Sequence, residues 1–396
     1  PIACQIERSC FTFKSVVDRS FDPQLSNMIH KAIQFAGTLI AAVLPLSANA
    51  QEALPNDIFE AAAQADPNYA LSFSYAFGQN DPTVMTAGPT VKDGSVLVAN
   101  DARWHIGSIS KSFTSTLVMR LVERGLLDLD NPVGTYLSDH KDQIHPDWKA
   151  ATLRQLLSHT AGLPANAPPR TMRKTYDYAP SQGRQAVLAE MWDRPLEGEA
   201  GKFLYSNLGY VLTGFIVEEV LDMSWEEAIQ SEIGTPLGLP SLGFGAPTQL
   251  DAARGHRTFW GFRRPVSPED PLSDNPKWMG PAGTIHLSMK DLTRWGHVHL
   301  DICTGGKPDY LSHESCQIMQ TPVASDYGLG WVLKTSEEEG RVVWHNGSNT
   351  MWYAMLLIVP DSNLVLALAT NQFKPGPIDK LARDLAKSLI DRRDHE

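Results

Sequence analysis

Residues 108–126 read SISKSFTSTLVMRLVERGL, a serine–lysine pair followed by an amphipathic repeat. The apolar side chains recur at helical spacing, at Ile109, Phe113, Leu117, Leu121 and Leu126. The pattern therefore predicts a helix that begins at about Ser108. Because three residues correspond to about one helical turn, Ser108 and Lys111 are expected on the same face of this helix.

Strand-like segments flank a long middle part of the chain. The middle, up to about residue 320, mixes helical stretches with loops rich in Pro and Gly. We expect one group of strands before it, a second group after residue 326, and a helix at each end. The expected strands are 69–76, 82–88, 95–99, 327–334, 341–345, 351–360 and 363–371, and the terminal helices are 56–65 and 377–392.

This order of elements predicts an α/β fold of the α+β type, in which both ends of the chain build one antiparallel sheet. The sheet lobe is expected to comprise residues 51–107 and 320–396, and a mostly helical lobe residues 108–319. Together the two lobes are expected to form a single domain over residues 51–396.

The composition is that of a globular protein, with 42% hydrophobic and 20% charged residues. The 34 Lys and Arg are outnumbered by 45 Asp and Glu, which gives a formal net charge of −11. No block of Lys and Arg stands out. Since a nucleic-acid-binding protein needs a basic face to neutralise phosphates, we expect no nucleic acid partner. The sequence leaves the oligomeric state open.

Residues 28–50 have the features of a secretory signal peptide. Lys31 precedes an apolar run at 36–46, and an Ala-x-Ala cleavage site ends at Ala50. The apolar run is shorter than the ~20 residues that span a bilayer, so we expect no stable membrane anchor. The expected product is a secreted protein of the bacterial periplasm. Residues 1–27 precede the signal peptide and are expected to be no native part of the fold.

Two cysteines, Cys303 and Cys316, belong to the expected mature chain. An exported protein meets conditions that permit disulfides. Either a bridge between these cysteines or two free buried thiols therefore fits the sequence.

The tetrad Ser108–Lys111, of the form S-x-x-K, is the candidate nucleophile. The chain lacks G-x-S-x-G, H-E-x-x-H, C-x-x-C and phosphate-loop motifs, so we expect neither an α/β-hydrolase nor a metal or cofactor. A serine hydroxyl is a weak nucleophile until a base takes its proton, and a nearby lysine can be that base or can lower the pKa of a second base. Taken alone, the tetrad also fits a helix-capping serine beside a solvated lysine.

Two further motifs can contribute polar groups to one site. The segment YSN at 205–207 presents a phenol and an amide, and the phenol serves as a base only next to a cation. The segment HNG at 345–347 continues into Ser348, and Gly347 allows a substrate to approach the backbone closely. In isolation, the first motif also fits a buried tyrosine beside a turn, and the second a strand-end turn.

The three motifs occur in the order found in active-site serine hydrolases of the penicillin-recognising type. Tyr205 follows Ser108 by 97 residues, and His345 follows Tyr205 by 140. The chain resembles the branch that contains class C β-lactamases, D-Ala-D-Ala carboxypeptidases and related esterases. The resemblance covers nearly all of 56–371 and implies a β-lactamase/transpeptidase-like fold. Further segments that resemble this family are TLRQLLSHTAGLP at 152–164, NLGYVLTGFIVEEV at 207–220 and GPAGTIHLSMKDLTRW at 280–295.

The resemblance assigns roles to the motif residues. Ser108 would attack the substrate carbonyl and form an acyl-enzyme. Lys111 and Tyr205 would handle the proton as a coupled pair, and which of them is the base stays open. The oxyanion hole would consist of the N–H groups of Ser108 and Ser348. Asn207 would bind a substrate amide or orient Lys111.

Position 345 departs from the pattern of the β-lactamases in this branch, which carry Lys-Thr-Gly where this chain has His-Asn-Gly. A lysine is charged and holds the carboxylate of a β-lactam, whereas an ordinary histidine is mostly neutral at pH 7. We therefore expect an esterase or peptidase-like hydrolase of small esters or amides. The alternatives are a β-lactamase and a penicillin-binding sensor without turnover. On this reasoning, any β-lactam activity should rise as the pH drops toward 6 and His345 gains a proton.

The sequence also supports interpretations of four other side chains. His159, in the 152–164 segment, resembles a structural residue of the family rather than a catalytic base. Trp260, Trp278 and Met279 lie in loop-rich segments, where lining the pocket and packing elsewhere both fit the sequence.

Overall fold

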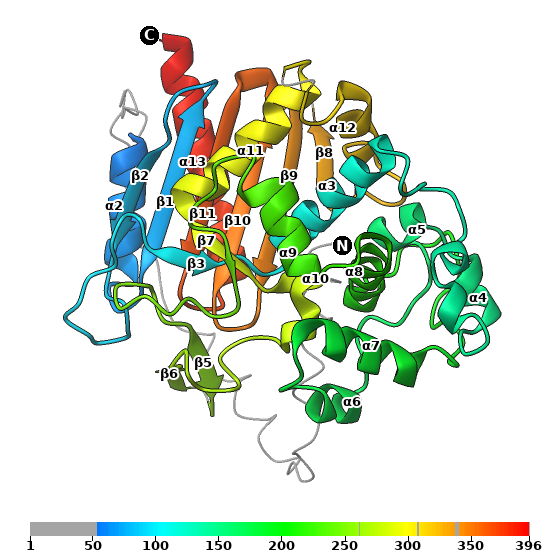
Figure 1. Ribbon diagram of the computed structural model, residues 1–396. Coiled ribbons are helices and arrows are strands. Elements are labelled where there is room, and N and C mark those ends of the chain that lie inside the picture. Colours follow the sequence, from blue (N-terminus) through cyan, green and yellow to red (C-terminus); the bar gives the residue numbers. More distant parts are fainter. Residues whose placement is uncertain (1–53, 261, 307–308, 337–339, 396) are drawn as a thin grey trace, which may run out of the picture.

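A six-stranded sheet forms the centre of the computed structural model, which describes residues 54–395 apart from 261, 307–308 and 337–339 (Figure 1). The strand order is β2-β1-β11-β10-β9-β8, and all neighbours are antiparallel. Strands from both ends of the chain therefore meet in one sheet, as predicted. The strands are β1 (Leu71–Phe77), β2 (Thr83–Ala87), β8 (Val332–Ser336), β9 (Gly340–Ser348), β10 (Tyr353–Val359) and β11 (Leu364–Thr370).

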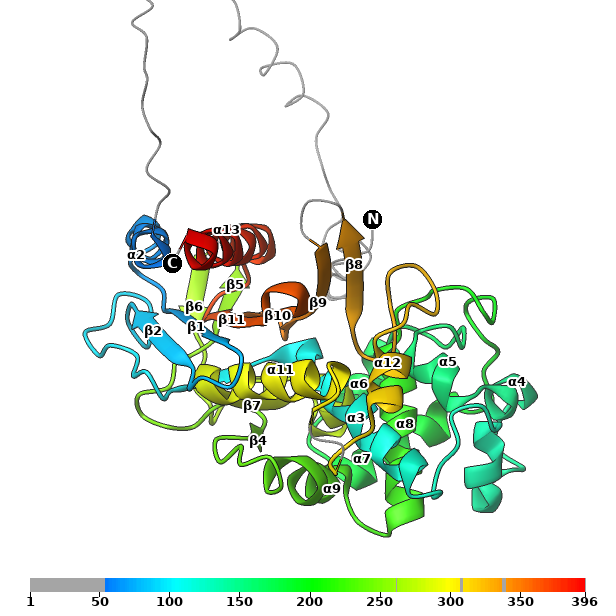
Figure 2. The ribbon, with the colours of Figure 1, turned by 90° about the horizontal axis from the view of Figure 1, so that it is seen from above.

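Helices cover both faces of this sheet. The terminal helices α2 (Pro55–Ala65) and α13 (Pro375–His395) lie side by side on one face, and α11 (Met289–Cys303) lies on the other (Figure 2). Every residue of β10 and β11 is buried. Alternate side chains therefore enter two cores: Met355 packs beneath α13, and Leu356 packs toward α11. Burial on both faces explains why these strands read as continuous apolar runs rather than as an alternation.

The helical part is arranged around α8 (Asn207–Leu221), which is buried along most of its length, and α3 (Ser110–Glu123) packs against it. A small sheet carries the chain into α3. Its strands are β3 (Arg103–His105), β7 (Ile285–Ser288) and β4 (Gly243–Phe244), and a separate hairpin consists of β5 (His256–Phe259) and β6 (Phe262–Pro265). The remaining helices are α4 (Pro146–Ala150), α5 (Leu153–Leu157), α6 (Pro169–Lys174), α7 (Pro180–Met191), α9 (Trp225–Ile229), α10 (Gly280–Gly283) and α12 (His313–Met319).

One strand prediction is wrong, and another is wrong in part. Residues 95–99 form a loop with an isolated bridge between Pro89 and Leu97, and Leu97 is 70% exposed, so its apolar alternation has no sheet to join. The predicted strand 327–334 begins only at Val332. Gly330 has φ +79°, and a Cβ on it would lie 2.8 Å from the Lys111 carbonyl oxygen. The segment before β8 therefore runs against α3 instead of pairing in the sheet.

Cys303 and Cys316 form a disulfide that joins the end of α11 to α12. Of the two arrangements that the sequence left open, the structure has the bridge. The predicted signal peptide and the segment before it lie outside the described residues. Within the part of the chain that the structure describes, no helix combines the length and hydropathy needed to cross a bilayer.

Candidate active site

The backbone around Ser108 is held against the end of β9 by two glycines. Ser108 lies in a 3-10 turn, Gly107–Ile109, that leads directly into α3. Gly107 has φ +51°, and a Cβ on it would lie 2.1 Å from the Ser348 nitrogen. A Cβ on Gly347 would lie 2.5 Å from the Ser108 nitrogen. A side chain at either position would push the segments apart, so glycine at 107 and 347 allows the two backbone segments to lie against each other.

Lys111 lies in the first turn of α3 and is completely buried. Its Nζ donates to the Ser108 Oγ at 3.2 Å, to the Asn207 Oδ1 at 2.7 Å and to the Ala282 carbonyl oxygen at 2.7 Å. The same nitrogen lies 4.9 Å from the centre of the Tyr205 ring, within cation–π range. The alternative of a solvated lysine on the helix surface is therefore excluded.

Tyr205 and Asn207 reach the site from the start of α8. The Ser206 hydroxyl caps this helix by accepting the Gly209 N–H at 3.0 Å, and it donates to the Pro164 carbonyl oxygen at 2.6 Å. Tyr205 is 4% exposed. The Asn207 amide nitrogen donates to the Asn166 Oδ1 at 2.9 Å, which leaves its oxygen directed at Lys111. Of the two roles considered for Asn207, its contacts favour orienting the lysine.

His159 packs against the turn that carries Tyr205 and Asn207. Its Nδ1 accepts the Ser206 N–H at 3.1 Å, and its ring centre lies 4.1 Å from that of Tyr205. Burial lowers the pKa of His159 well below its ordinary value, and the charge of Lys111 lowers it further. The ring is therefore neutral, and its contacts are those of a residue that holds the Tyr205–Asn207 turn in place.

His345 is completely buried in β9 and bonded on both sides of its ring. Its Nδ1 lies 2.5 Å from the Asn346 carbonyl oxygen, so Nδ1 carries the proton, and its Nε2 accepts from the Tyr327 hydroxyl at 3.0 Å. Burial, and then the charge of Lys111, lower the pKa of His345 to about 3. The expectation that His345 gains a proton near pH 6 is therefore wrong. The sequence alone reveals neither the burial of His345 nor its proximity to Lys111.

The sequence profile of the Beta-lactamase family matches residues 70–390. The chain belongs to the beta-lactamase family. It is 29% identical to "Penicillin-binding protein 4" of Amycolatopsis lactamdurans over 339 residues, 82% of this chain and 85% of the relative.

Solved structures of the beta-lactamase fold confirm the predicted architecture of an antiparallel sheet with helices. The octameric penicillin-binding protein homologue from Pyrococcus abyssi superposes with a TM-score of 0.71 and 23% identity, over 85% of this chain and 76% of that one. The class C beta lactamase from Rhodobacter sphaeroides gives a TM-score of 0.66 and 21% identity, over 85% and 99% of the two chains.

Several contacts of this beta-lactamase-family site were not predicted from the sequence. Tyr327 bonds His345, Asn166 bonds Asn207, and the Ala282 carbonyl oxygen accepts from Lys111. Ala282 lies in the 280–295 segment, whose resemblance to the family was the one available signal. Tyr327 and Asn166 lie outside every motif, so only the three-dimensional arrangement identifies them.

Two of the three side chains considered for the pocket pack in the core of this member of the beta-lactamase family. Trp278 and Met279 are 2% and 5% exposed and belong to the core, where Trp278 packs on Gly183 of α7. Trp260 is 78% exposed in the β5–β6 hairpin. For Trp278 and Met279 the packing alternative is therefore correct.

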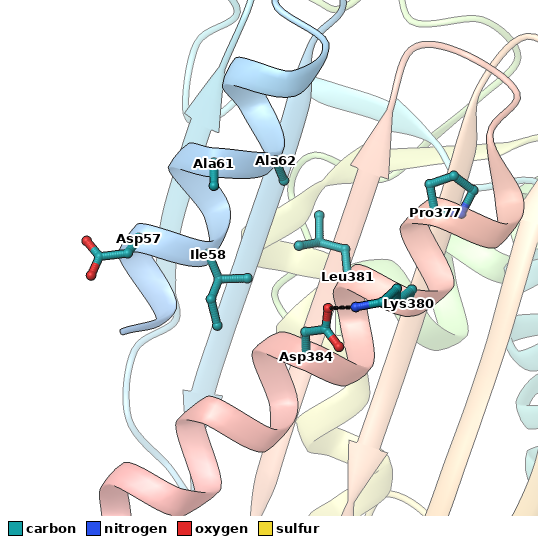
Figure 3. A pocket seen from close by; sticks show the side chains of 8 residues that line it. All are labelled: Asp57, Ile58, Ala61, Ala62, Pro377, Lys380, Leu381 and Asp384. Carbon is teal, nitrogen blue, oxygen red and sulfur yellow. Dashed lines mark hydrogen bonds and ion pairs between the residues drawn. The ribbon is translucent and has the colours of Figure 1, made fainter. Parts of the chain in front are cut away.

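A shallow cavity of about 550 Å³ lies between α2 and α13 (Figure 3). It is lined by apolar side chains such as Ile58 and Leu381, with a Lys380–Asp384 ion pair at its edge. Because α2 and α13 cover the sheet face opposite α11, this cavity is separate from the site around Ser108 (Figure 2). It offers no nucleophile beside a base.

Proposed function

We propose that the protein is an active-site serine hydrolase that forms an acyl-enzyme on Ser108 and acts on small esters or amides. The observation that carries this proposal is the contact between the Ser108 hydroxyl and the buried Lys111 Nζ at 3.2 Å. Burial of a lysine is costly unless its donors are satisfied, and here three oxygens surround it. Such an arrangement is expected where a lysine must exchange a proton with a serine.

The proposed reaction has two halves. Ser108 Oγ attacks the carbonyl carbon while its proton passes to the Lys111–Tyr205 pair, and the N–H groups of Ser108 and Ser348 stabilise the oxyanion. The bond to the leaving group then breaks, and the leaving group takes the proton from the pair. In the second half, water attacks the acyl-enzyme and gives the pair a proton, which returns to Ser108 as the acid product departs.

The neutral state of His345 supports a preference for substrates without a carboxylate at this position. A β-lactam brings a carboxylate beside the strand that carries residues 345–347, and a charge-assisted hydrogen bond would hold it there. With its pKa lowered to about 3, His345 supplies no cation at neutral pH. Neutral esters and small amides need no cation at this position, so its absence does not lower the rate of their hydrolysis.

A rate panel tests this proposal. We expect p-nitrophenyl acetate or butyrate to be hydrolysed with a higher kcat/KM than a chromogenic cephalosporin, with a D-Ala-D-Ala peptide as the amide member. A fluorescent penicillin, followed over time, separates the other candidates: a β-lactamase loses the label quickly, and a penicillin-binding sensor keeps it. Faster hydrolysis of the cephalosporin than of the esters, or a permanent penicillin label without ester turnover, would overturn the proposal.

A further inference from the structure

One carboxylate oxygen, the Oδ1 of Asp274, contacts donor groups from both sides of the expected oxyanion hole. It lies 2.8 Å from the His105 Nε2, 2.9 Å from the Asn349 Nδ2 and 2.6 Å from the backbone nitrogen of Asn275. The side chains of His105 and Asp274 are 0% and 9% exposed. Asp274 itself lies in a loop, and the Tyr176 hydroxyl anchors it by donating to its carbonyl oxygen at 2.5 Å.

The first arm of this arrangement leads to Ser108. The Gly107 N–H donates to the His105 Nδ1 at 3.2 Å, so the ring proton is on Nε2, which faces Asp274. The Nε2–H is not aligned with Oδ1, so this 2.8 Å approach is a polar contact rather than a linear hydrogen bond. Through it, Asp274 fixes the orientation of the imidazole that holds the left-handed turn at Gly107, next to the Ser108 amide.

The second arm leads to Ser348. Besides donating to Asp274, Asn349 accepts the N–H groups of Met351 at 3.2 Å and Trp352 at 3.3 Å through its Oδ1. Asn349 thus closes the turn that follows Ser348. The turn includes Thr350 at φ +72°, a conformation that a β-branched residue adopts only when its surroundings impose it.

We propose that His105 and Asp274 are positioning residues that hold the Ser108 and Ser348 N–H groups at the separation that an oxyanion requires. This inference rests on the proposed function. The glycines at 107 and 347 permit the close approach of the two segments, but they supply no side-chain bond that maintains it. β3 and β9 belong to different sheets, and the Asp274 oxygen contacts His105, which leads into the Ser108 turn, and Asn349, which follows Ser348.

A positioning role predicts that geometry matters more than the charge of Asp274. Asp274→Asn keeps an oxygen that can accept from Asn349 and Asn275 and can lie beside the His105 Nε2–H, whereas Asp274→Ala removes it. We therefore expect Asp274→Asn to retain activity within about threefold of the wild type, and Asp274→Ala and His105→Ala to lose ~10–100-fold in kcat/KM for an oxygen ester, less than removal of an oxyanion donor itself. His286→Gln is the matched control, because this buried histidine is the β7 neighbour of His105 but its own side-chain hydrogen bond goes to the Gly245 carbonyl oxygen.

The test compares an oxygen ester with the matching thionoester, in which sulfur, a weak hydrogen-bond acceptor, replaces the carbonyl oxygen. Misplaced N–H donors lower kcat/KM for the oxygen ester, whereas kcat/KM for the thionoester stays within about threefold of the wild-type value. The ratio of kcat/KM for the oxygen ester to kcat/KM for the thionoester should therefore fall at least fivefold in Asp274→Ala and His105→Ala. In Asp274→Asn and His286→Gln it should stay at the wild-type value. Equal losses for both substrates, or a fallen ratio in His286→Gln, would overturn the inference.

Two further measurements keep the outcome unambiguous. If Asp274→Ala does not fold, as judged by its thermal transition, Asn349→Ala cuts only the Ser348 arm, and its ratio should fall while the variant stays folded. An unchanged ratio in folded Asn349→Ala would then overturn the inference. Failure of the proposed function is separate: it appears as a wild-type protein that neither hydrolyses the ester nor reacts with a fluorophosphonate at Ser108.

Discussion

Replacing His345 with lysine tests the link between this position and substrate choice. His345 is completely buried, its Nε2 accepts from the Tyr327 hydroxyl at 3.0 Å, and its pKa is lowered to about 3. His345→Lys would place an ammonium group in the same position. That group can pair with the carboxylate of a β-lactam and can also donate to Tyr327.

The expected gain follows from the strength of a charge-assisted hydrogen bond, about 1.5–3 kcal/mol. At about 1.4 kcal/mol per factor of ten, this corresponds to a ~10–150-fold change in relative rate. Lys111 opposes the gain, because its charge already lowers the pKa of His345 and would repel a second cation. We therefore expect the lower end, ~10-fold.

The assay is the ratio of kcat/KM for a chromogenic cephalosporin to kcat/KM for a p-nitrophenyl ester. His345→Gln serves as the matched control, because it replaces the imidazole with a polar group that carries no charge. The ratio should rise ~10-fold in His345→Lys and by less than about twofold in His345→Gln. An equal rise in both variants, or no rise in His345→Lys, would refute the charge argument.

Three other predictions follow from the described contacts. Asn207→Ala removes the side-chain oxygen 2.7 Å from Lys111 and should lower kcat/KM for the ester ~10-fold or more, and full activity would show that the contact is dispensable. The double change Cys303→Ser and Cys316→Ser opens a loop with a sequence separation of 13 and should lower the free energy of unfolding in urea by about 2–3 kcal/mol, so an unchanged midpoint would contradict it. Burial lowers the pKa of His299 to about 3, so the unfolded chain binds a proton that the folded chain does not between about pH 6.5 and 3. The contribution of His299 to the free energy of unfolding should fall by about 1.4 kcal/mol per pH unit as the pH drops through this window. The free energy of unfolding of His299→Gln should therefore depend less steeply on pH than that of the wild type.

Local patterns predicted the elements that depend on local chemistry. The repeat after Ser108 correctly predicted α3, and the apolar runs near the C-terminus correctly predicted β10 and β11. The segment 95–99 also has a strand pattern but forms a loop with one isolated bridge, because it has no neighbouring strand to pair with. Strand propensity therefore sufficed only where the sheet supplied a partner.

Properties of the site that depend on distant residues could not be predicted from the sequence. The low pKa of His345 arises from burial and from Lys111, which is far away along the chain. The contact between His105 and Asp274 likewise joins a strand before the nucleophile to the loop that follows β6. No spacing rule connects such positions, so the motifs identified the reacting groups but not the residues that support them.

The central claim is a covalent acyl-enzyme on Ser108, and peptide-mapping mass spectrometry of quenched reactions tests it most directly. Wild-type protein, mixed with a slowly deacylating ester or a fluorophosphonate and quenched in acid, should gain the mass of one adduct on the peptide that contains Ser108. Ser108→Ala should show no adduct and no hydrolysis while keeping the thermal transition of the wild type. An adduct on another residue, or hydrolysis that persists in folded Ser108→Ala, would contradict the account.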